Sequence, residues 1–155
     1  MSFDAYVVAS GPGLWRAAFL LTGDRHKAED LVQTVLAKCF GKYRGNDQQF
    51  DAYVRKAIYH TYVSWWRRHW NAEDPTEALP EQQQTPADAE VSLDVLRALA
   101  TLPKMQRAVL VLRYFEDRSV QDTARILGIS EGTVKSHATR GCAALRSCVH
   151  LKEAA

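Results

Sequence analysis

The chain has 155 residues, 46% of them hydrophobic and 25% charged, which is enough for one ordinary hydrophobic core or two small ones. No apolar run reaches the length of a membrane span, and Asp4 stands where a signal peptide would need basic residues. We therefore expect a cytoplasmic protein that makes no membrane contact. The three cysteines are an odd number at irregular spacing, which argues against a disulfide framework and is typical of a reducing compartment.

The net charge of +2 conceals two basic blocks around an acidic strip. Residues 71–90 hold six acidic side chains and no Lys or Arg, so the rest of the chain carries a net charge of +8. Because folded basic segments attract polyanions, this separation favours nucleic-acid binding by the parts on either side of the strip.

The first helical pattern runs from residue 4 to residue 21 and is interrupted at residues 11–13 by Gly-Pro-Gly. We expect a break or kink there, with Ser10 capping a helix that Pro12 opens, and an end at Gly23.

Two longer helices are predicted next. Asp24 is the expected N-terminal cap of the first, residues 41–47 form a loop, and the second helix ends near Trp70. The expected buried faces are Ala28, Leu31, Val32, Val35, Leu36, Cys39 and Phe40 in the first helix, and Val54, Ala57, Ile58, Thr61, Tyr62, Trp65 and Trp66 in the second. Residues 1–70 are therefore expected to form a helical bundle.

Residues 71–90 contain three prolines, the run Gln82-Gln83-Gln84 and a single large aliphatic residue, which predicts a flexible acidic linker. After it, two helices are expected over residues 91–102 and 103–115, with Pro103 in the first turn of the second. Residues 151–155 are expected to be a disordered tail.

Residues 120–139 have the spacing of a helix-turn-helix motif. Ser119 predicts the cap of a helix over residues 120–127, Gly128 suits a left-handed turn, and Ser130 caps the last helix. Small Ala124 would let the two helices approach closely, and Val134 would be buried between them.

The last helix then turns a polar face away from its buried side. Hydroxyl and basic side chains near a helix N-terminus suit both phosphates and the base edges of the major groove, although an ordinary solvated helix surface is the alternative. The residues expected on this face are Glu131, Thr133, Lys135, Ser136, Thr139 and Arg140.

The sequence shows no motif that indicates an enzyme. The sequence has no glycine-rich phosphate loop and no nucleophile motif, and the offsets between Cys142, Cys148 and His150 do not bring three metal ligands onto one helix face. We expect neither a cofactor nor a metal, and the chain is predicted not to be an enzyme.

Residues 20–36 read Leu-Leu-Thr-Gly-Asp-Arg-His-Lys-Ala-Glu-Asp-Leu-Val-Gln-Thr-Val-Leu, and here the chain resembles the extracytoplasmic-function sigma factors of the sigma-70 family. Further segments carry the same resemblance, and two of them are similar to the short SigE-like subfamily. The further segments are Leu102-Pro103, Gln106-Arg107, Leu112-Arg113-Tyr114 and Gly132-Thr133-Val134-Lys135-Ser136, and the SigE-like ones are Tyr53-Val54-Arg55 and Trp66-Arg67-Arg68.

The resemblance implies an all-α fold of two small helical domains: sigma region 2 over residues 1–70 and sigma region 4 over residues 91–150, joined by the linker. It implies an RNA polymerase sigma factor that binds core polymerase and directs promoter-specific initiation. Region 2 would dock on the clamp helices of the largest subunit and melt the minus-ten element of promoter DNA. Region 4 would read the minus-thirty-five element and contact the flap region of the second-largest subunit.

The same resemblance assigns residues to each contact. Core polymerase would be bound by Glu29, Asp30, Gln33 and Thr34; minus-ten DNA by Arg55, Lys56, Tyr59, His60, Trp66, Arg67 and Arg68; and minus-thirty-five DNA by Arg118, Ser130, Glu131, Thr133, Lys135, Ser136, Thr139 and Arg140. Thr34 and His60 depart from the glutamate and asparagine common in the family. Trp66 also lies on the apolar stripe of its helix, so packing is its alternative role.

Three matters stay open at this level. The linker would either pass towards the RNA exit path or act only as a tether. An anti-sigma factor, and an energy-dependent protease reading the terminal Ala154-Ala155, are candidate partners. A stand-alone helix-turn-helix regulator that never docks on polymerase is the rival function, and the acidic surface at Asp30 and Gln33 distinguishes the two.

Overall fold

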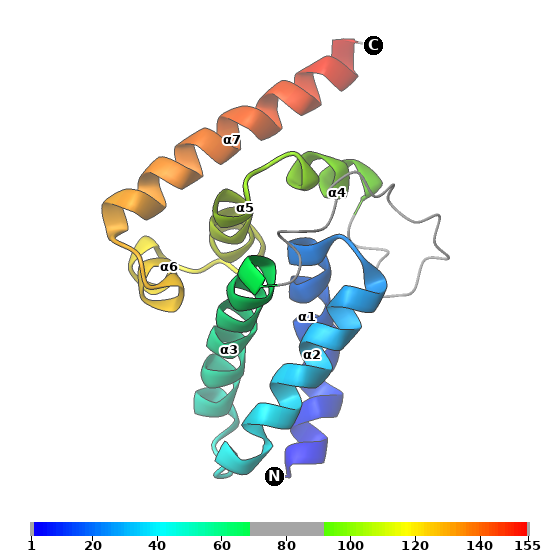
Figure 1. The fold of residues 1–155 in the computed structure, drawn as a ribbon, viewed down its shortest axis with the longest axis vertical. Helices are drawn as coiled ribbons and strands as arrows, with labels where there is room; N and C mark the ends of the chain where they lie inside the picture. Colours follow the sequence, from blue (N-terminus) through cyan, green and yellow to red (C-terminus); the bar gives the residue numbers. More distant parts are fainter. Residues whose placement is uncertain (1, 69–91, 155) are drawn as a thin grey trace. The chain divides into compact units, whose positions relative to one another are not determined.

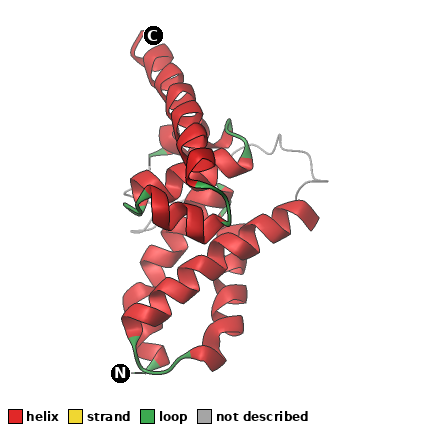
Figure 2. Cartoon of the chain, turned by 90° about the vertical axis from the view of Figure 1, so that its left-hand side faces the viewer, coloured by secondary structure: helices red, strands yellow, loops and turns green. Residues whose placement is uncertain are grey.

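The computed structural model describes residues 2–68 and 92–154, with side chains up to Ser147. The chain divides into two compact units, residues 1–90 and 91–155. Every regular element in the described ranges is a helix, which confirms the all-α prediction (Figure 2). The acidic linker predicted at 71–90 lies outside the described residues. No helix in those ranges is both long and apolar enough to cross a membrane.

Helix α1, Phe3–Thr22, is one continuous helix, so the predicted break at residues 11–13 is wrong. It begins at Ser2, whose Oγ accepts a hydrogen bond from the backbone N–H of Ala5, and not at Ser10. Pro12 and Val8 both lie on the exposed side, where water can solvate the carbonyl group that Pro12 leaves without a donor. Buried side chains before and after the proline hold both halves of the helix against the same core.

Gly23 ends α1 in the left-handed conformation, with φ of 70°, and Asp24 caps α2, Arg25–Cys39, as predicted. The expected apolar face of α2 is buried except at Phe40, which is 62% exposed. Phe40 opens a 3-10 turn, η1 (Phe40–Lys42), and this tighter winding turns its side chain away from the face that the α-helical spacing predicts.

Helix α3, Asp47–Arg68, begins two residues after Gly45 with Asn46 as its cap, since the Asn46 Oδ1 accepts from the backbone N–H of Gln49. The three helices of the first unit pack side by side (Figure 1). Aromatic rings join them where α3 begins: the ring centroid of Phe50 lies 4.9 Å from that of Tyr6 and 5.1 Å from that of Tyr43. Large side chains therefore dominate this core.

The second unit contains four α-helices and one π-helical turn within residues 92–154. They are α4 (Leu93–Ala100), α5 (Lys104–Leu110), the π-helical turn η4 (Val111–Phe115), α6 (Val120–Leu127) and α7 (Glu131–Ala154). The helices predicted on either side of Pro103 are therefore shorter than expected, and Pro103 occupies the cap position just before α5 instead of its first turn.

Helix α7 continues to Ala154, so the expectation of a disordered tail from residue 151 is wrong up to that residue. The segment Leu-Lys-Glu-Ala consists of strong helix formers and holds no breaker, which explains why the helix does not stop. Helix α7 packs against both α5 and α6 (Figure 1).

Candidate nucleic-acid interface

The helix-turn-helix of α6 and α7 has three local features that the sequence predicted: a cap at the start of each helix and a left-handed glycine in the turn. The Ser119 Oγ accepts from the backbone N–H of Asp122 at 2.9 Å, and the Ser130 Oγ accepts from that of Thr133 at 3.1 Å. Gly128 has φ of 69°, in the left-handed region that a residue with a Cβ enters only with strain. Gly128 and the Ser130 cap together set the direction in which α7 leaves the turn.

A small apolar core holds this motif together, with Val109, Ala124 and Val134 buried at its centre. Ala124 and Val134 therefore lie where the helix-turn-helix spacing predicts. Four more side chains pack partly buried around them: Val120, Leu127, Ile129 and Ala138. The small Ala124 side chain leaves room for α6 to pack against α7 at Val134.

The polar face of α7 is solvent-exposed, as the sequence predicted, except at Thr133. The exposed residues are Ser130, Glu131, Lys135, Ser136, Thr139 and Arg140. Thr133 is half-buried, and its hydroxyl lies 2.8 Å from that of Ser130. Two hydroxyls thus lie together at the N-terminus of α7, where the Ser130 Oγ accepts from the Thr133 N–H.

Arg118 lies in the connection between η4 and α6 and is half-buried. Its backbone is fixed at both ends, because its N–H donates to the Leu112 carbonyl oxygen at 2.8 Å and its carbonyl accepts from the guanidinium of Arg113. The preceding Asp117 has φ of 54°, a conformation that aspartate tolerates better than most residues. This fixed backbone places Arg118 just before the N-terminus of the helix-turn-helix.

His137 lies among the cations of α7 but does not add to their charge at neutral pH. Burial, with the nearby charge of Arg140 as a smaller cause, holds the pKa of the His137 imidazole below its usual range. The positive charge of this surface therefore comes from Lys135 and Arg140.

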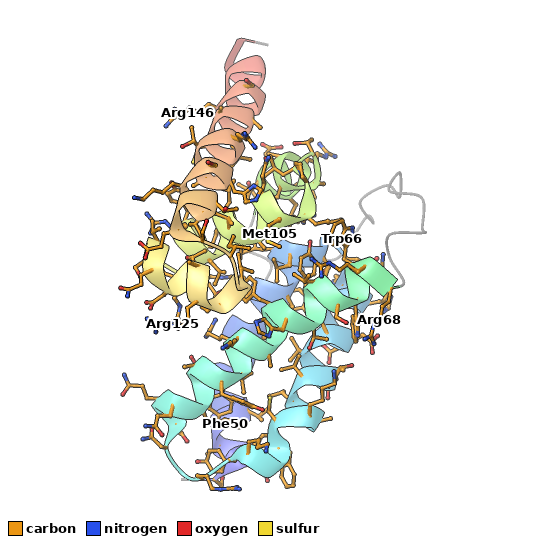
Figure 3. The ribbon with its side chains drawn as sticks, turned by 60° about the vertical axis from the view of Figure 1, so that its left-hand side comes forward. Phe50, Trp66, Arg68, Met105, Arg125 and Arg146 are labelled. Atoms are coloured by element: carbon orange, nitrogen blue, oxygen red, sulfur yellow. The ribbon has the colours of Figure 1, made fainter. Side chains whose placement is uncertain are left out.

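Helix α3 carries the residues assigned to minus-ten DNA, and they do not all share one environment. Lys56, His60, Arg67 and Arg68 are exposed, while Arg55 and Trp66 are half-buried. Figure 3 shows Trp66 and Arg68 near the end of α3 and Phe50 near its start. Tyr59 is 0% exposed, so its place on a DNA-facing surface is wrong: its position beside Ile58 and Tyr62 puts it at the edge of the apolar stripe, where it is covered.

Arg55 is tied to two residues, Asp51 and Tyr6, that no sequence motif assigns to the site. Its Nε donates to the Asp51 Oδ2 at 2.9 Å, and the Tyr6 hydroxyl donates to the Asp51 Oδ1 at 2.8 Å. The spacing of four residues between Asp51 and Arg55 is a signal that the sequence contains. Nothing in the sequence pairs Tyr6 with Asp51, because they lie 45 residues apart.

The surface assigned to core polymerase lies on α2, opposite its buried side. Glu29, Asp30 and Gln33 are exposed, and Thr34 is half-buried. The Gln33 Nε2 donates to the Glu29 Oε1 at 3.2 Å, so these two side chains are paired while Asp30 lies beside them. The arrangement offers carboxylates and an amide to a basic partner.

Three exposed side chains near the DNA-binding surface proposed on α3 were not predicted from the sequence. Tyr53 is 47% exposed on the side of α3 that carries Lys56 and His60, and Lys42 and Arg44 are exposed in the segment before α3. The spacing of Tyr53 and Lys56, three residues apart on one helix, is a pattern from which the exposed tyrosine could have been predicted. The segment before α3 carries no motif that would have indicated Lys42 and Arg44.

The cysteines and possible metal ligands form no site in the part of the chain that the structure describes. Cys39 is buried in α2, and burial raises the pKa of its thiol. Cys142 is half-buried and not in a disulfide, and no cluster of three metal-ligating side chains occurs among the described residues. The side chains of Cys148 and His150 lie outside them.

Two family profiles match the chain, one in each half. The family described as Sigma-70 region 2 matches residues 7–72, and the family described as Sigma-70, region 4 matches residues 92–145. The first begins within α1 and includes all of α2 and α3, and the second begins at the cap of α4 and ends within α7.

Similar whole proteins point the same way. The chain is 40% identical over 153 residues to the RNA polymerase sigma-E factor of Streptomyces coelicolor, covering 94% of this chain and 85% of that protein. It is 34% identical over 143 residues to the ECF RNA polymerase sigma factor SigL of Mycobacterium tuberculosis, covering 86% and 80%.

A solved structure shares the fold across both units. The sigma factor RpoE of Bartonella quintana, in a co-crystal structure with the anti-sigma factor NepR, matches with a TM-score of 0.75 and 25% identity, covering 96% of each chain. Matching regions, similar whole proteins and a shared fold agree, so the chain belongs to the sigma-70 family of RNA polymerase sigma factors, in its extracytoplasmic-function group.

Proposed function

We propose that residues 1–70 dock on core RNA polymerase and melt the minus-ten element, while residues 91–150 read the duplex minus-thirty-five element. Docking would use the clamp helices of the largest subunit for the first part and the flap region of the second-largest subunit for the second. The linker at 71–90 would join the two. The protein would act in the cytoplasm, where the polymerase is, and it would act as a binding subunit and not as an enzyme.

One observation separates this proposal from a stand-alone DNA-binding regulator: the exposed polar surface of α2. Asp30 and Gln33 are exposed on a helix whose opposite side is fully buried at Leu31 and Val35. A regulator that binds only duplex DNA has no use for an acidic surface on a separate unit, because carboxylates repel phosphates. A basic helix of a protein partner is the complementary surface.

Run-off transcription with purified core polymerase on a genomic promoter library tests the docking surface. We expect specific transcripts that require the added protein and that weaken in Asp30→Ala/Gln33→Ala. Lys38→Ala, an exposed residue at the other end of α2, is the control and should transcribe like the wild type. Binding to promoter DNA without any recruitment of polymerase would favour the stand-alone regulator.

The face of α7 supports the second half of the proposal. Lys135 is exposed in the second turn of α7 and Arg140 farther along the same helix, which follows a tight, capped turn, the geometry in which such helices lie in the major groove. Lys135→Ala and Arg140→Ala should each weaken binding to minus-thirty-five DNA and reduce the dependence of affinity on salt.

Arg146→Ala is the matched control for this surface. It removes the same charge from the same helix, but six residues beyond Arg140, or roughly 9 Å along the axis. Figure 3 shows Arg146 along α7, and Arg125 on α6. Equal losses for Arg140→Ala and Arg146→Ala would indicate general electrostatic attraction instead of a placed recognition helix.

Melting of the minus-ten element is proposed for the exposed part of α3. Lys56, His60, Arg67 and Arg68 would hold the phosphates of the separated strand, and the half-buried Trp66 ring would stack on an unpaired base. Permanganate reactivity of promoter thymines would measure strand opening. Arg67→Ala/Arg68→Ala should lower that reactivity at concentrations where polymerase binding is saturated.

Two further partners are proposed from the comparisons and the sequence. The similar sigma factor of Bartonella quintana is bound by an anti-sigma factor, and we propose such a protein as a regulator of this chain. The terminal Ala154-Ala155 is proposed as a protease signal, although Ala155 lies outside the described residues. A cellular lifetime unchanged by Ala154→Asp/Ala155→Asp would rule the second partner out.

A further inference from the structure

A buried tyrosine of α1 reaches across the first unit to a carboxylate of α3. Tyr6 is only 2% exposed, and its hydroxyl donates to the Asp51 Oδ1 at 2.8 Å. The ring is held from the side by Phe50, with the centroids 4.9 Å apart and the planes 76° apart. The tyrosine therefore has little freedom, and its hydrogen bond fixes the rotation of the Asp51 carboxylate.

The second oxygen of that carboxylate holds Arg55. The Asp51 Oδ2 accepts from the Arg55 Nε at 2.9 Å, one helical turn along α3, so each carboxylate oxygen has a different donor. The Arg55 and Asp51 side chains are only 18% and 29% exposed, which limits the screening of this ion pair by water. The pair is thus more buried than the ion pair of Arg125 with Asp122 on α6, whose side chains are 66% and 46% exposed.

Helix α1 also limits the far end of Arg55. A Cβ atom on Gly13 would lie 3.4 Å from the Arg55 Nη2, so the guanidinium group lies against the backbone of α1 at that glycine. Burial, followed by the hydrogen bond to Asp51, holds the pKa of the Tyr6 hydroxyl far above its usual range. The hydroxyl thus remains a proton donor, and the network keeps one hydrogen-bond direction.

We propose that Tyr6 and Asp51 are positioning residues that hold the guanidinium group of Arg55 ready for a phosphate of the promoter strand. This inference rests on the proposed function of α3. A long flexible side chain loses rotamer freedom when it binds, and a guanidinium that is already held in place loses less. Lys56, its exposed neighbour on α3, has no such arrangement among the hydrogen bonds of the described residues.

The chain offers a matched pair of tyrosine variants for the test. Tyr6→Phe removes one oxygen atom and keeps the packing of the ring. Tyr43→Phe removes the same atom from a second tyrosine–aspartate hydrogen bond on α3, in which the Tyr43 hydroxyl donates to the Asp47 Oδ1 at 2.6 Å, but no described arginine is bound to Asp47. The second variant therefore controls for the loss of a hydrogen bond alone.

Binding of the complex with core polymerase to a forked promoter DNA, single-stranded over the minus-ten element, is measured at several salt concentrations. We expect Tyr6→Phe to weaken this binding by about three- to tenfold and to reduce the salt slope by up to about one, as for a displaced phosphate contact. Affinity for core polymerase alone should not change. Tyr43→Phe should match the wild type in both measurements.

A double-mutant cycle with Arg55→Ala decides whether Tyr6 acts through Arg55. If it does, Tyr6→Phe has no further effect on DNA binding once Arg55→Ala is present. A full additional loss in the double mutant, an unchanged Tyr6→Phe, or tighter DNA binding by Tyr6→Phe would each overturn the proposal. If Tyr6→Phe does not fold, Asp51→Asn takes its place in the same cycle.

The outcome also separates this inference from the function on which it rests. Promoter-specific transcription by the wild type with core polymerase tests the proposed function. If the wild type transcribes and Arg55→Ala binds the forked DNA normally, only the role of Arg55 and its network is wrong.

Discussion

The two units fill their cores with different side chains. In the first, α1 to α3 pack through aromatic as well as aliphatic residues, with Tyr6, Leu14 and Leu31 fully or almost fully buried. In the second, the buried apolar side chains of the described residues are aliphatic, and Gly141 of α7 lies directly against Leu110. Both units should therefore be sensitive to the loss of volume, and the second also to its gain at Gly141.

The two units also differ in how they hold the cations that are proposed to contact DNA. Arg55 is half-buried and held by Asp51, whereas Lys135 and Arg140 are exposed on α7. An exposed cation is positioned by the direction of its helix, so the turn and caps before α7 determine where Lys135 lies. A half-buried cation is positioned by its neighbours, so contacts between helices determine where Arg55 lies.

The largest expected effect is the loss of a large side chain from the first unit. Leu31 is 0% exposed, and Leu31→Ala should lower the free energy of unfolding by about 3 kcal/mol, through lost apolar burial and the cavity left behind. Denaturant unfolding measures the change, and hydrogen exchange of α1 to α3 assigns it to this unit. Val8→Ala, at a side chain 79% exposed, should be nearly neutral.

Added volume should be the sharper test of the second unit. A Cβ atom at Gly141 would lie 2.8 Å from the Leu110 Cδ1 and 3.0 Å from its Cγ, and Leu110 is buried and cannot yield freely. Gly141→Ala should destabilise the unit by about 1–2 kcal/mol, although alanine favours the helix by about 1 kcal/mol.

Gly132→Ala is the control for that substitution, because it lies on the same helix and the nearest atom to its Cβ would be the Ser130 Oγ at 3.9 Å. We expect it to keep or raise the free energy of unfolding. A Gly141→Ala protein as stable as Gly132→Ala would show that close approach does not determine the packing of α7.

A smaller effect is expected from the cap that starts the helix-turn-helix. Ser119→Ala removes the oxygen that accepts from the Asp122 N–H and should cost about 1 kcal/mol. Thermal unfolding of the second unit measures it. Gln121→Ala, an exposed substitution within the same helix, should lie within a few tenths of a kcal/mol of the wild type. Equal losses of stability in Ser119→Ala and Gln121→Ala would show that the cap does not stabilise α6.

The smallest effect is a pH dependence confined to the second unit. Because the pKa of His137 is lowered in the folded state, the unfolded chain binds the proton more readily. Stability should therefore be fully present above the unfolded pKa of about 6.5 and should fall as the pH drops towards the folded value. His137→Gln should flatten this slope in denaturation measured from pH 7.5 to 5. An unchanged slope would place its origin elsewhere.

Local features were predictable because each depends on neighbours in the chain. The caps at Asp24, Ser119 and Ser130 are side chains that accept from a backbone N–H three residues later. Gly23 and Gly128 end their helices because glycine takes the left-handed conformation without strain. The bounds of α6 and the buried face of α2 up to Cys39 follow from spacing in the same way. The same periodicity predicts that Asp30, Gln33 and Lys135 are exposed, because they lie on the sides of their helices opposite the apolar residues.

The errors fall where distant parts of the chain meet or where a helix changes its winding. Pro12 should interrupt an isolated helix, but burial on both sides of it keeps α1 continuous, and the carbonyl that it frees faces water. Phe40 leaves its predicted face because a 3-10 turn replaces the last α-helical turn, and Tyr59 is covered although its spacing is marginal.

The pairing of Tyr6 with Asp51, and the contact of Gly141 with Leu110, join residues that no local rule relates. Helix periodicity states only which side of a helix is apolar. Which partner fills that side, and which polar group is held beside it, depends on how three or four helices fit together at close packing.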